Sequence, residues 1–249
     1  MFDSISIPTI LVSYVALLFS LSVHEASHAS AAYLLEDDTA ARLGRMTLNP
    51  LAHMDFLGTF VFPLLGMTTG FPFIGWAKPV PVDPRNLTRR FNQRTGYAMV
   101  AAAGPASNLA LSVIFIGILL VLARVLAPAP SVQVPLFLHA IFMGRVEGLQ
   151  ALGMGTGMTL ALALCGRLVL INIGLALFNL LPMGPLDGAG ILRGMLPWRY
   201  LPKFDRVQPW MGGLLIVLAL TGILGYLLSP VFIVVQTGLV LIARLFLGA

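Results

Sequence analysis

The sequence predicts an all-α polytopic membrane protein. The 249-residue chain is 58% hydrophobic and only 10% charged, with a mean hydropathy of +0.92. A soluble globular domain of this length does not need so much apolar surface. The apolar runs are long and unbroken, whereas the strands of a membrane barrel alternate in segments of about ten residues. Helices satisfy their own backbone hydrogen bonds, so they are the structure expected in lipid.

About five to six transmembrane helices are expected, with a re-entrant or extended element near the active site. The apolar segments are residues 7–34, 55–75, 95–125, 158–181, 207–228 and 230–248. Polar loops lie at 36–50, 76–94 and 182–206, and a proline-rich turn lies at 126–135. Residues 136–157 are apolar but contain Arg145 and Glu147, so this segment either lies on the membrane surface or spans it.

Basic residues indicate the orientation. The net charge of +5 comes from Lys and Arg gathered in a few loops, which in a membrane protein signals sidedness and not nucleic-acid binding. The basic loops 76–94 and 182–206 are expected on the cytoplasmic side, and 36–50 leans the same way. Segment 55–75 must then enter and leave on one face. Its glycines and prolines favour this re-entrant alternative over a full span, which would go with 136–157 spanning as well.

The most informative motif lies inside the first apolar segment. His24-Glu25-x-x-His28 places two histidines on one helical face, where they can bind one divalent metal ion. Glu25 can then deprotonate a water molecule held by that metal. Ionisable side chains are costly in a membrane and usually have a functional partner there. A helix from Ile7 rises about 25 Å to His24 across a core of about 30 Å, so the site is expected nearer the cytoplasmic face.

Zinc hydrolases usually have three protein ligands, and three acidic residues are candidates for the third. They are Asp55, Glu147 and Asp187. Asp187 is favoured because it follows an apolar run and lies between proline and glycine, as a carboxylate at a helix break would. An ordinary turn or N-cap aspartate is the alternative. With Cys165 as the single cysteine, a Cys-based metal site and an intrachain disulfide are excluded.

Three motifs together resemble the site-2 protease family of intramembrane zinc metalloproteases. They are His24-Glu25-x-x-His28, Ala103-Gly104-Pro105-Ala106-Ser107-Asn108 and Asn179-Leu180-Leu181-Pro182-x-x-Pro185-Leu186-Asp187-Gly188, and the resemblance covers roughly residues 7–228. It implies one Zn²⁺ per chain, with His24, His28 and Asp187 as ligands. It also implies that Glu25 is the general base and that Asn179 positions substrate or stabilises the oxyanion.

The resemblance also implies a substrate-binding element. Two prolines prevent residues 78–82 from forming a helix, and residues 76–82 lie where family members have an extended element that pairs with substrate as an added strand. The residues expected to contact substrate are Trp76, Lys78, Val80, Val82 and Asn108. Asn108 is alternatively a structural hydrogen-bonding residue between helices. The 249 residues contain neither an inserted PDZ domain nor a nucleotide-binding pair, so a compact family form is expected.

The expected function is zinc-dependent hydrolysis of peptide bonds within or near transmembrane segments of membrane-protein or peptide substrates, that is, regulated intramembrane proteolysis. We expect one integral-membrane metalloprotease domain over residues 1–249, with its catalytic core at about 7–188 and C-terminal helices at about 207–248. The expected location is the lipid bilayer of a prokaryotic cell membrane, and the oligomeric state stays open.

Three other function classes are alternatives to this one. A zinc-binding scaffold or chaperone without protease activity would need the same ligands but not Glu25. A metal transporter would carry ligands along a whole pathway across the membrane. A prenyl-processing protease would carry a glutamate followed by asparagine, whereas Glu147 is followed by Gly148.

Overall fold

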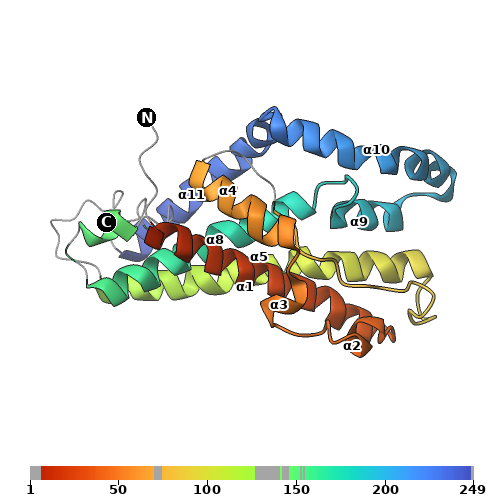
Figure 1. Ribbon diagram of the computed structural model, residues 1–249, viewed down its shortest axis with the longest axis horizontal. Coiled ribbons are helices and arrows are strands. Elements are labelled where there is room, and N and C mark those ends of the chain that lie inside the picture. Colours follow the sequence, from red (N-terminus) through yellow and green to blue (C-terminus); the bar gives the residue numbers. More distant parts are fainter. Residues whose placement is uncertain are drawn as a thin grey trace.

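The computed structural model describes residues 7–69, 75–126, 141, 146–151, 153 and 155–247. Within these residues the regular structure is helical and contains no strand, which confirms the predicted all-α class. Helices α1 (Ile7–Leu34), α5 (Gln93–Leu126) and α8 (Thr156–Asn179) pack side by side along the long axis of the molecule (Figure 1). We call them the three-helix core.

The other elements are shorter or lie outside this core. They are α2 (Thr39–Arg42), α3 (Pro50–His53), the π-helical turn η1 (Phe56–Val61), α4 (Phe62–Thr69), α7 (Val146–Gln150), α9 (Asp187–Met195), the 3-10 turn η2 (Trp198–Tyr200), α10 (Leu201–Leu220) and α11 (Ile223–Leu247). Helices α10 and α11 pack on each other and form what we call the C-terminal pair.

Four helices in the described part of the chain are long and apolar enough to cross a membrane, namely α1, α5, α8 and α11. The chain is therefore a multi-pass membrane protein. Helix α10 is not among these four, because it carries Lys203, Asp205 and Arg206 in its first half. The predicted boundary between 207–228 and 230–248 is displaced in the structure. The break falls at Gly222, which has a φ of 76°. Residues with a side chain rarely adopt this backbone conformation, whereas glycine does so readily.

Segment 55–75 returns to the end from which it starts. Helices η1 and α4 lead away from His53, and the chain then comes back along a non-helical stretch, residues 75–83, which we call the return segment. The Trp76 N–H donates to the Gly58 carbonyl (3.0 Å) and the Lys78 N–H to the His53 carbonyl (2.8 Å). A full span would separate these groups by the membrane thickness, so the re-entrant alternative is the one that fits. Residues 70–74, and most of 136–157, lie outside the described residues.

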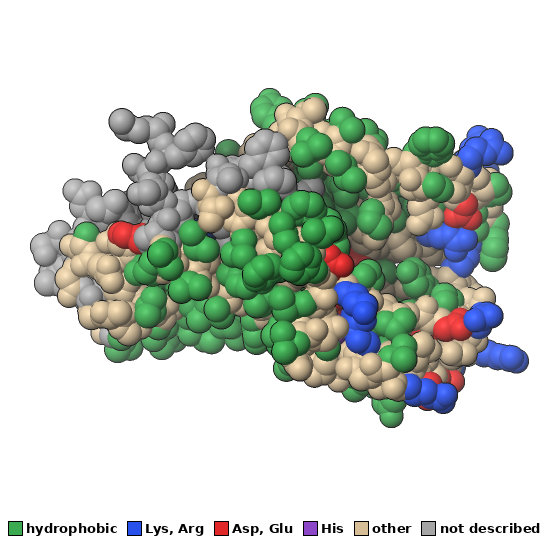
Figure 2. Space-filling model, viewed as in Figure 1, with side chains coloured by type: hydrophobic (Ala, Val, Ile, Leu, Met, Phe, Trp, Pro, Cys, Tyr) green, Lys and Arg blue, Asp and Glu red, His purple; other side chains and the backbone are tan. Residues whose placement is uncertain are grey.

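Charged side chains gather at one end of the molecule, whereas hydrophobic ones dominate the middle of the same face (Figure 2). The charged end is formed by α2, α9 and the start of α10 (Figure 1). Helix α1 begins at the opposite end and runs toward the charged one. The two histidines near the end of α1 consequently lie nearer the charged end than the other.

Candidate metal centre

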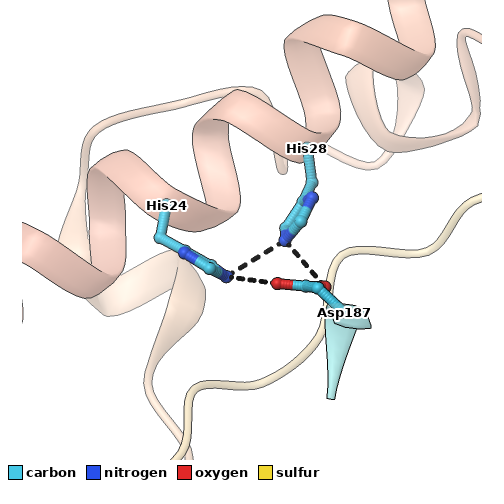
Figure 3. Close-up of side chains that lie close together, drawn as sticks. All are labelled: His24, His28 and Asp187. Carbon is cyan, nitrogen blue, oxygen red and sulfur yellow. Dashed lines mark hydrogen bonds and ion pairs between the residues drawn. The ribbon is translucent and has the colours of Figure 1, made fainter. Parts of the chain in front are cut away.

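Three candidate ligands converge between α1 and the start of α9 (Figure 3). His24 and His28 lie one turn apart on α1, and Asp187 is the first residue of α9. The His24 Nε2 atom lies 3.1 Å from His28 Nε2 and 3.1 Å from Asp187 Oδ2. The His28 Nε2 atom lies 3.3 Å from Asp187 Oδ1. The three residues expected to bind zinc are thus brought together, with all their ligand atoms within 4.8 Å of one another.

The sequence after α8 explains how Asp187 reaches the histidines. Helix α8 ends at Asn179, and a proline-containing turn reverses the chain before α9 begins. Gly188 permits this close reversal. A Cβ atom there would lie 2.3 Å from the Leu181 carbonyl oxygen and 2.4 Å from that of Leu180, so a larger residue would push Asp187 away from α1.

The hydrogen bonds behind the imidazole rings fit a metal site. His28 Nδ1 lies 2.8 Å from the Val100 carbonyl oxygen, which can only accept a hydrogen bond, so Nδ1 carries the proton. His24 Nδ1 lies 2.6 Å from Asn108 Oδ1, another acceptor. In the neutral form of each ring, Nε2 is then left with a lone pair. Two lone pairs and a carboxylate this close repel one another unless a cation lies among them, and such outer hydrogen bonds are usual for metal-binding histidines.

Two further observations fit a bound ion. Asp187 Oδ2 is buried and lies 3.1 Å from His24 Nε2, so this carboxylate oxygen is directed at the same point as the imidazole nitrogens. Gly104 of α5 leaves room beside the rings, because a Cβ atom there would lie 2.4 Å from His28 Nε2 and 2.6 Å from His24 Cε1. Two imidazoles and one carboxylate form a donor set typical of zinc hydrolases.

Glu25 faces the same cavity as the three candidate ligands. This cavity has a volume of about 450 Å³ and is also lined by the return segment, Asn179 and α10. Glu25 is buried, and its Oε2 accepts a hydrogen bond from the Val80 N–H (2.9 Å). The return segment therefore holds the carboxylate beside the metal ligands, and the site combines a metal-binding set with a neighbouring acid–base group.

Comparison with known proteins agrees with this geometry, since residues 12–221 match the model of Peptidase family M50. The chain belongs to Peptidase family M50. It is 34% identical over 216 residues to "Putative zinc metalloprotease YwhC" of Bacillus subtilis, covering 87% of this chain and 83% of that protein. It is 29% identical over 205 residues to "Putative zinc metalloprotease Rip2" of Mycolicibacterium smegmatis, covering 82% of this chain and 63% of that protein. No solved structure matches the chain.

Membership of family M50 confirms the resemblance to site-2 proteases and makes the chain a zinc metalloprotease. The expected contacts of this M50 peptidase with substrate divide into two groups. Trp76, Val80 and Val82 line the cavity, as does Asn179. Lys78 does not line it: its side chain is exposed.

Asn108 also differs from its expected role in substrate contact. It is fully buried and bonds to His24 from behind, outside the cavity lining. The structural alternative is therefore the one that fits Asn108. The other candidates for a third ligand lie elsewhere in the M50 peptidase: Asp55 caps η1 through the N–H groups of Leu57 and Gly58, and Glu147 accepts a hydrogen bond from Thr9.

Three supporting residues of the M50 peptidase are absent from the sequence predictions. Val100 acts through its backbone carbonyl group, so its residue type gives no indication of this role. Ser20 and Asn172 are fully buried polar residues in apolar helices. Asn172 in an otherwise apolar run was a usable signal, because a polar side chain in lipid requires a partner.

Proposed function

We propose that this chain is an intramembrane zinc endopeptidase that cleaves peptide bonds within or near transmembrane segments of other membrane proteins. The observation that carries the proposal is the convergence of His24, His28 and Asp187 beside Glu25 in one cavity. Membership of family M50 supports zinc-dependent proteolysis. The cavity walls are largely apolar, with Leu21, Trp76, Leu175, Phe178, Leu215 and Ile216 among them, which favours an apolar substrate segment.

In this proposal His24, His28 and Asp187 hold one Zn²⁺ per chain. When bound, zinc would polarise the scissile carbonyl and lower the pKa of the attacking water. Glu25 accepts the proton of that water and passes it to the leaving amine. The Val80 N–H holds Oε2 of Glu25, which keeps the carboxylate oriented while Oε1 receives the proton.

Asn179 is proposed to stabilise the developing oxyanion. It lines the cavity at the end of α8, and its Nδ2 donates one hydrogen bond to the Leu175 carbonyl (3.0 Å). A side-chain amide nitrogen has two hydrogens. The bond to Leu175 fixes the amide plane, and the second hydrogen is available to the substrate oxygen, where a donor is worth most in the transition state.

The substrate is proposed to unwind and lie extended beside residues 76–82. A helical peptide bond is shielded by its neighbours, so it must be exposed before attack. In this stretch the N–H groups of Trp76, Lys78 and Val80 already donate within the chain, and the two prolines have no N–H. The N–H groups of Ala77 and Val82 are therefore the ones left to donate to a substrate. An added strand would therefore be held mainly by its own N–H groups donating to carbonyls of the return segment.

The charged end of the molecule is proposed to face the cytoplasm. Lys and Arg side chains gather there (Figure 2), which is the usual sidedness of basic residues in membrane proteins. The bacterial relatives support a prokaryotic cell membrane as the location. Residues 1–249 are proposed as one domain, with a core at about 7–188 that contains the complete site, and with C-terminal helices at about 207–248 that add a wall to the cavity.

The first test is zinc content, because it needs no substrate. Wild type, Asp187→Ala and the control Asp205→Ala are purified in detergent, replenished with zinc and analysed for bound metal. Asp205 pairs with Arg193 at the surface (2.8 Å), away from the candidate ligands. We expect about one zinc per chain in wild type and control and a large loss in Asp187→Ala. Zinc-free wild type would refute the metal site, and equal zinc in all three would refute Asp187 as a ligand.

The second test separates a protease from a zinc-binding scaffold. Glu25→Gln preserves shape but cannot accept the proton, so zinc should stay bound while cleavage falls by roughly 10²–10⁴-fold. The probe is a fluorogenic transmembrane peptide, interrupted by glycine and proline, reconstituted with the enzyme in lipid vesicles. Wild-type cleavage by Glu25→Gln would remove Glu25 from the mechanism.

A further inference from the structure

A series of hydrogen bonds leads from His24 away from the metal site and across the three-helix core. Asn108 of α5, Asn172 of α8 and Ser20 of α1 are each 0% exposed. Asn108 Oδ1 lies 2.6 Å from His24 Nδ1, and Asn108 Nδ2 lies 2.7 Å from Asn172 Oδ1. Asn172 Nδ2 in turn lies 2.8 Å from Ser20 Oγ. We call these three residues the buried relay.

Two backbone carbonyls set the direction of the bonds at the far end of the relay. The Ser20 hydroxyl lies 2.7 Å from the Ala16 carbonyl oxygen, and Asn172 Nδ2 lies 2.8 Å from the Leu168 carbonyl oxygen. A carbonyl oxygen can only accept. The Ser20 hydroxyl therefore donates to Ala16 and accepts from Asn172. The amide nitrogen of Asn172 must be the atom that faces Ser20 and Leu168.

The same constraint passes through Asn108 to the metal ligand. With its nitrogen engaged, Asn172 turns its oxygen to Asn108 and accepts a hydrogen bond from the Asn108 amide. The Ser20 carbonyl, 3.3 Å away, is a second acceptor for that amide nitrogen. Asn108 must then present its oxygen to His24. Consequently His24 Nδ1 carries a proton, and in the neutral ring Nε2 is the atom with the lone pair that faces Asp187.

We propose that Asn172 and Ser20 are positioning residues, which act through Asn108 to hold His24 in the tautomer that binds the metal. This inference rests on the proposed zinc site. Reversing one amide would bring two donors or two acceptors together at a fully buried position, which is costly. His28 needs no relay, because the Val100 carbonyl fixes its Nδ1 proton directly.

The chain contains a matched control for the relay. Ser22 lies two residues from Ser20 on α1, is also buried, and bonds back to the Leu18 carbonyl (2.7 Å) as Ser20 bonds to Ala16. Among the described residues, its hydroxyl makes no hydrogen bond to a member of the relay. Ser20→Ala and Ser22→Ala therefore remove the same group from the same helix, and only the first interrupts the path to His24.

The test measures zinc affinity of the purified full chain by competition with a chelator. We expect Asn172→Leu and Ser20→Ala to weaken zinc binding about tenfold, and Asn108→Ala by up to about 100-fold, the range found when outer partners of metal ligands are removed. Ser22→Ala should bind as wild type does. Since Asn172 acts through Asn108, adding Asn172→Leu to Asn108→Ala should weaken binding no further.

Each outcome of this comparison of single and double variants either supports or overturns the inference. Additive losses in the double variant, or equal losses in Ser20→Ala and Ser22→Ala, indicate general loosening of the core and would overturn it. Unchanged zinc affinity in both Asn172→Leu and Ser20→Ala would also overturn it. If Asn172→Leu does not fold, Ser20→Ala takes its place in the same cycle. Failure of wild type to bind zinc is a separate result, which refutes the metal site itself.

Discussion

The three-helix core and the C-terminal pair differ in how far their helices are buried inside the protein. In an 18-residue apolar stretch of each core helix, 50% of residues are buried inside the protein in α8, 44% in α1 and 22% in α5, whereas in α11 only 11% are buried. The core buries polar side chains, among them both histidines and two asparagines. The pair instead exposes large apolar and aromatic side chains, such as Trp210, Tyr226 and Val234.

This difference follows from the physics of lipid. Apolar side chains gain little by leaving a solvent as apolar as themselves, so close packing and polar bonds hold membrane helices together. The hydrogen bonds of the core have defined partners and therefore fix the positions of its side chains. The exposed apolar side chains of the C-terminal pair do not hold other residues in place in this way. Changes in the core should therefore affect zinc binding, and changes in the pair should affect only substrate binding and local packing.

Gly104→Ala should produce the largest effect. The added methyl group would lie 2.4 Å from His28 Nε2 and 2.6 Å from His24 Cε1, and hydrogen bonds from behind prevent both rings from retreating. We expect zinc affinity to fall by about 100-fold or more, measured by chelator competition. Gly117, on the same helix, has no atom within 4 Å of such a methyl group, so Gly117→Ala should bind zinc normally. Normal binding by Gly104→Ala would show that the core is less rigid than its bonds indicate.

The same contrast explains which parts of the site could be predicted from the sequence. His24, Glu25 and His28 lie within one helical turn, where spacing alone determines which side chains share a face. Asp187 could be predicted from its position at a helix break and from the resemblance. The contact of His28 with α5 was not predictable, because its hydrogen bond goes to the backbone carbonyl of Val100, which any residue would supply.

Helix boundaries in the C-terminal pair show a second limit. The expected division between 207–228 and 230–248 falls inside α11, which also contains Pro230. A membrane helix tolerates proline where neighbouring groups satisfy the freed carbonyl. The true break at Thr221 and Gly222 lies within an apolar run. Hydropathy detects such a run but carries little information about where its helices are divided.

Asp37→Ala should have the next largest effect, on stability. Asp37 is fully buried beyond the end of α1 and accepts hydrogen bonds from the N–H groups of Asp83 (2.8 Å) and Thr39 (3.1 Å), which tie the return segment to the core. Removing it leaves these partly buried N–H groups without their acceptor, at a cost of about 1–3 kcal/mol. Asp38 pairs with Arg42 at the surface, so Asp38→Ala should cost less than about 1 kcal/mol. Thermal unfolding in detergent measures both, and equal losses would contradict the assignment.

The pH dependence of the stability difference between wild type and Asp37→Ala gives a further check. Burial tends to raise the pKa of Asp37, but the hydrogen bonds from Thr39, Asp83 and Asn86 outweigh it and lower the pKa below its usual value. A lowered pKa stabilises the folded state above the pKa of the unfolded chain, and that contribution is lost as pH falls through the folded pKa. The gap between wild type and Asp37→Ala should therefore narrow in acid. A stability difference that widens in acid would contradict the conclusion that the ionised form of Asp37 stabilises the fold.

Val80→Pro should have a smaller effect, confined to catalysis. It removes the N–H that holds Glu25 Oε2, at a position already followed by proline and outside any helix. We expect kcat to fall about tenfold, the value of one hydrogen bond to a charged group, with zinc still bound. Val80→Ala keeps the N–H and serves as the control. If both variants lose the same activity, the side chain of Val80 and not its N–H is what matters.

Leu215→Ala tests the C-terminal pair and should have the smallest effect. Leu215 lines the cavity from α10 and packs with Ala219 and Leu224, so its loss should raise the KM for the fluorogenic peptide a few-fold, as for a shortened apolar contact of about 1 kcal/mol. Its neighbour Leu214 is 51% exposed, and Leu214→Ala should change nothing. Zinc affinity should stay at the wild-type value in both, because no polar bond of α10 reaches a metal ligand within the described chain. A loss of zinc in Leu215→Ala would mean that the pair helps to hold Asp187 in place, and the division between a core that binds metal and a pair that only forms a wall would then fail.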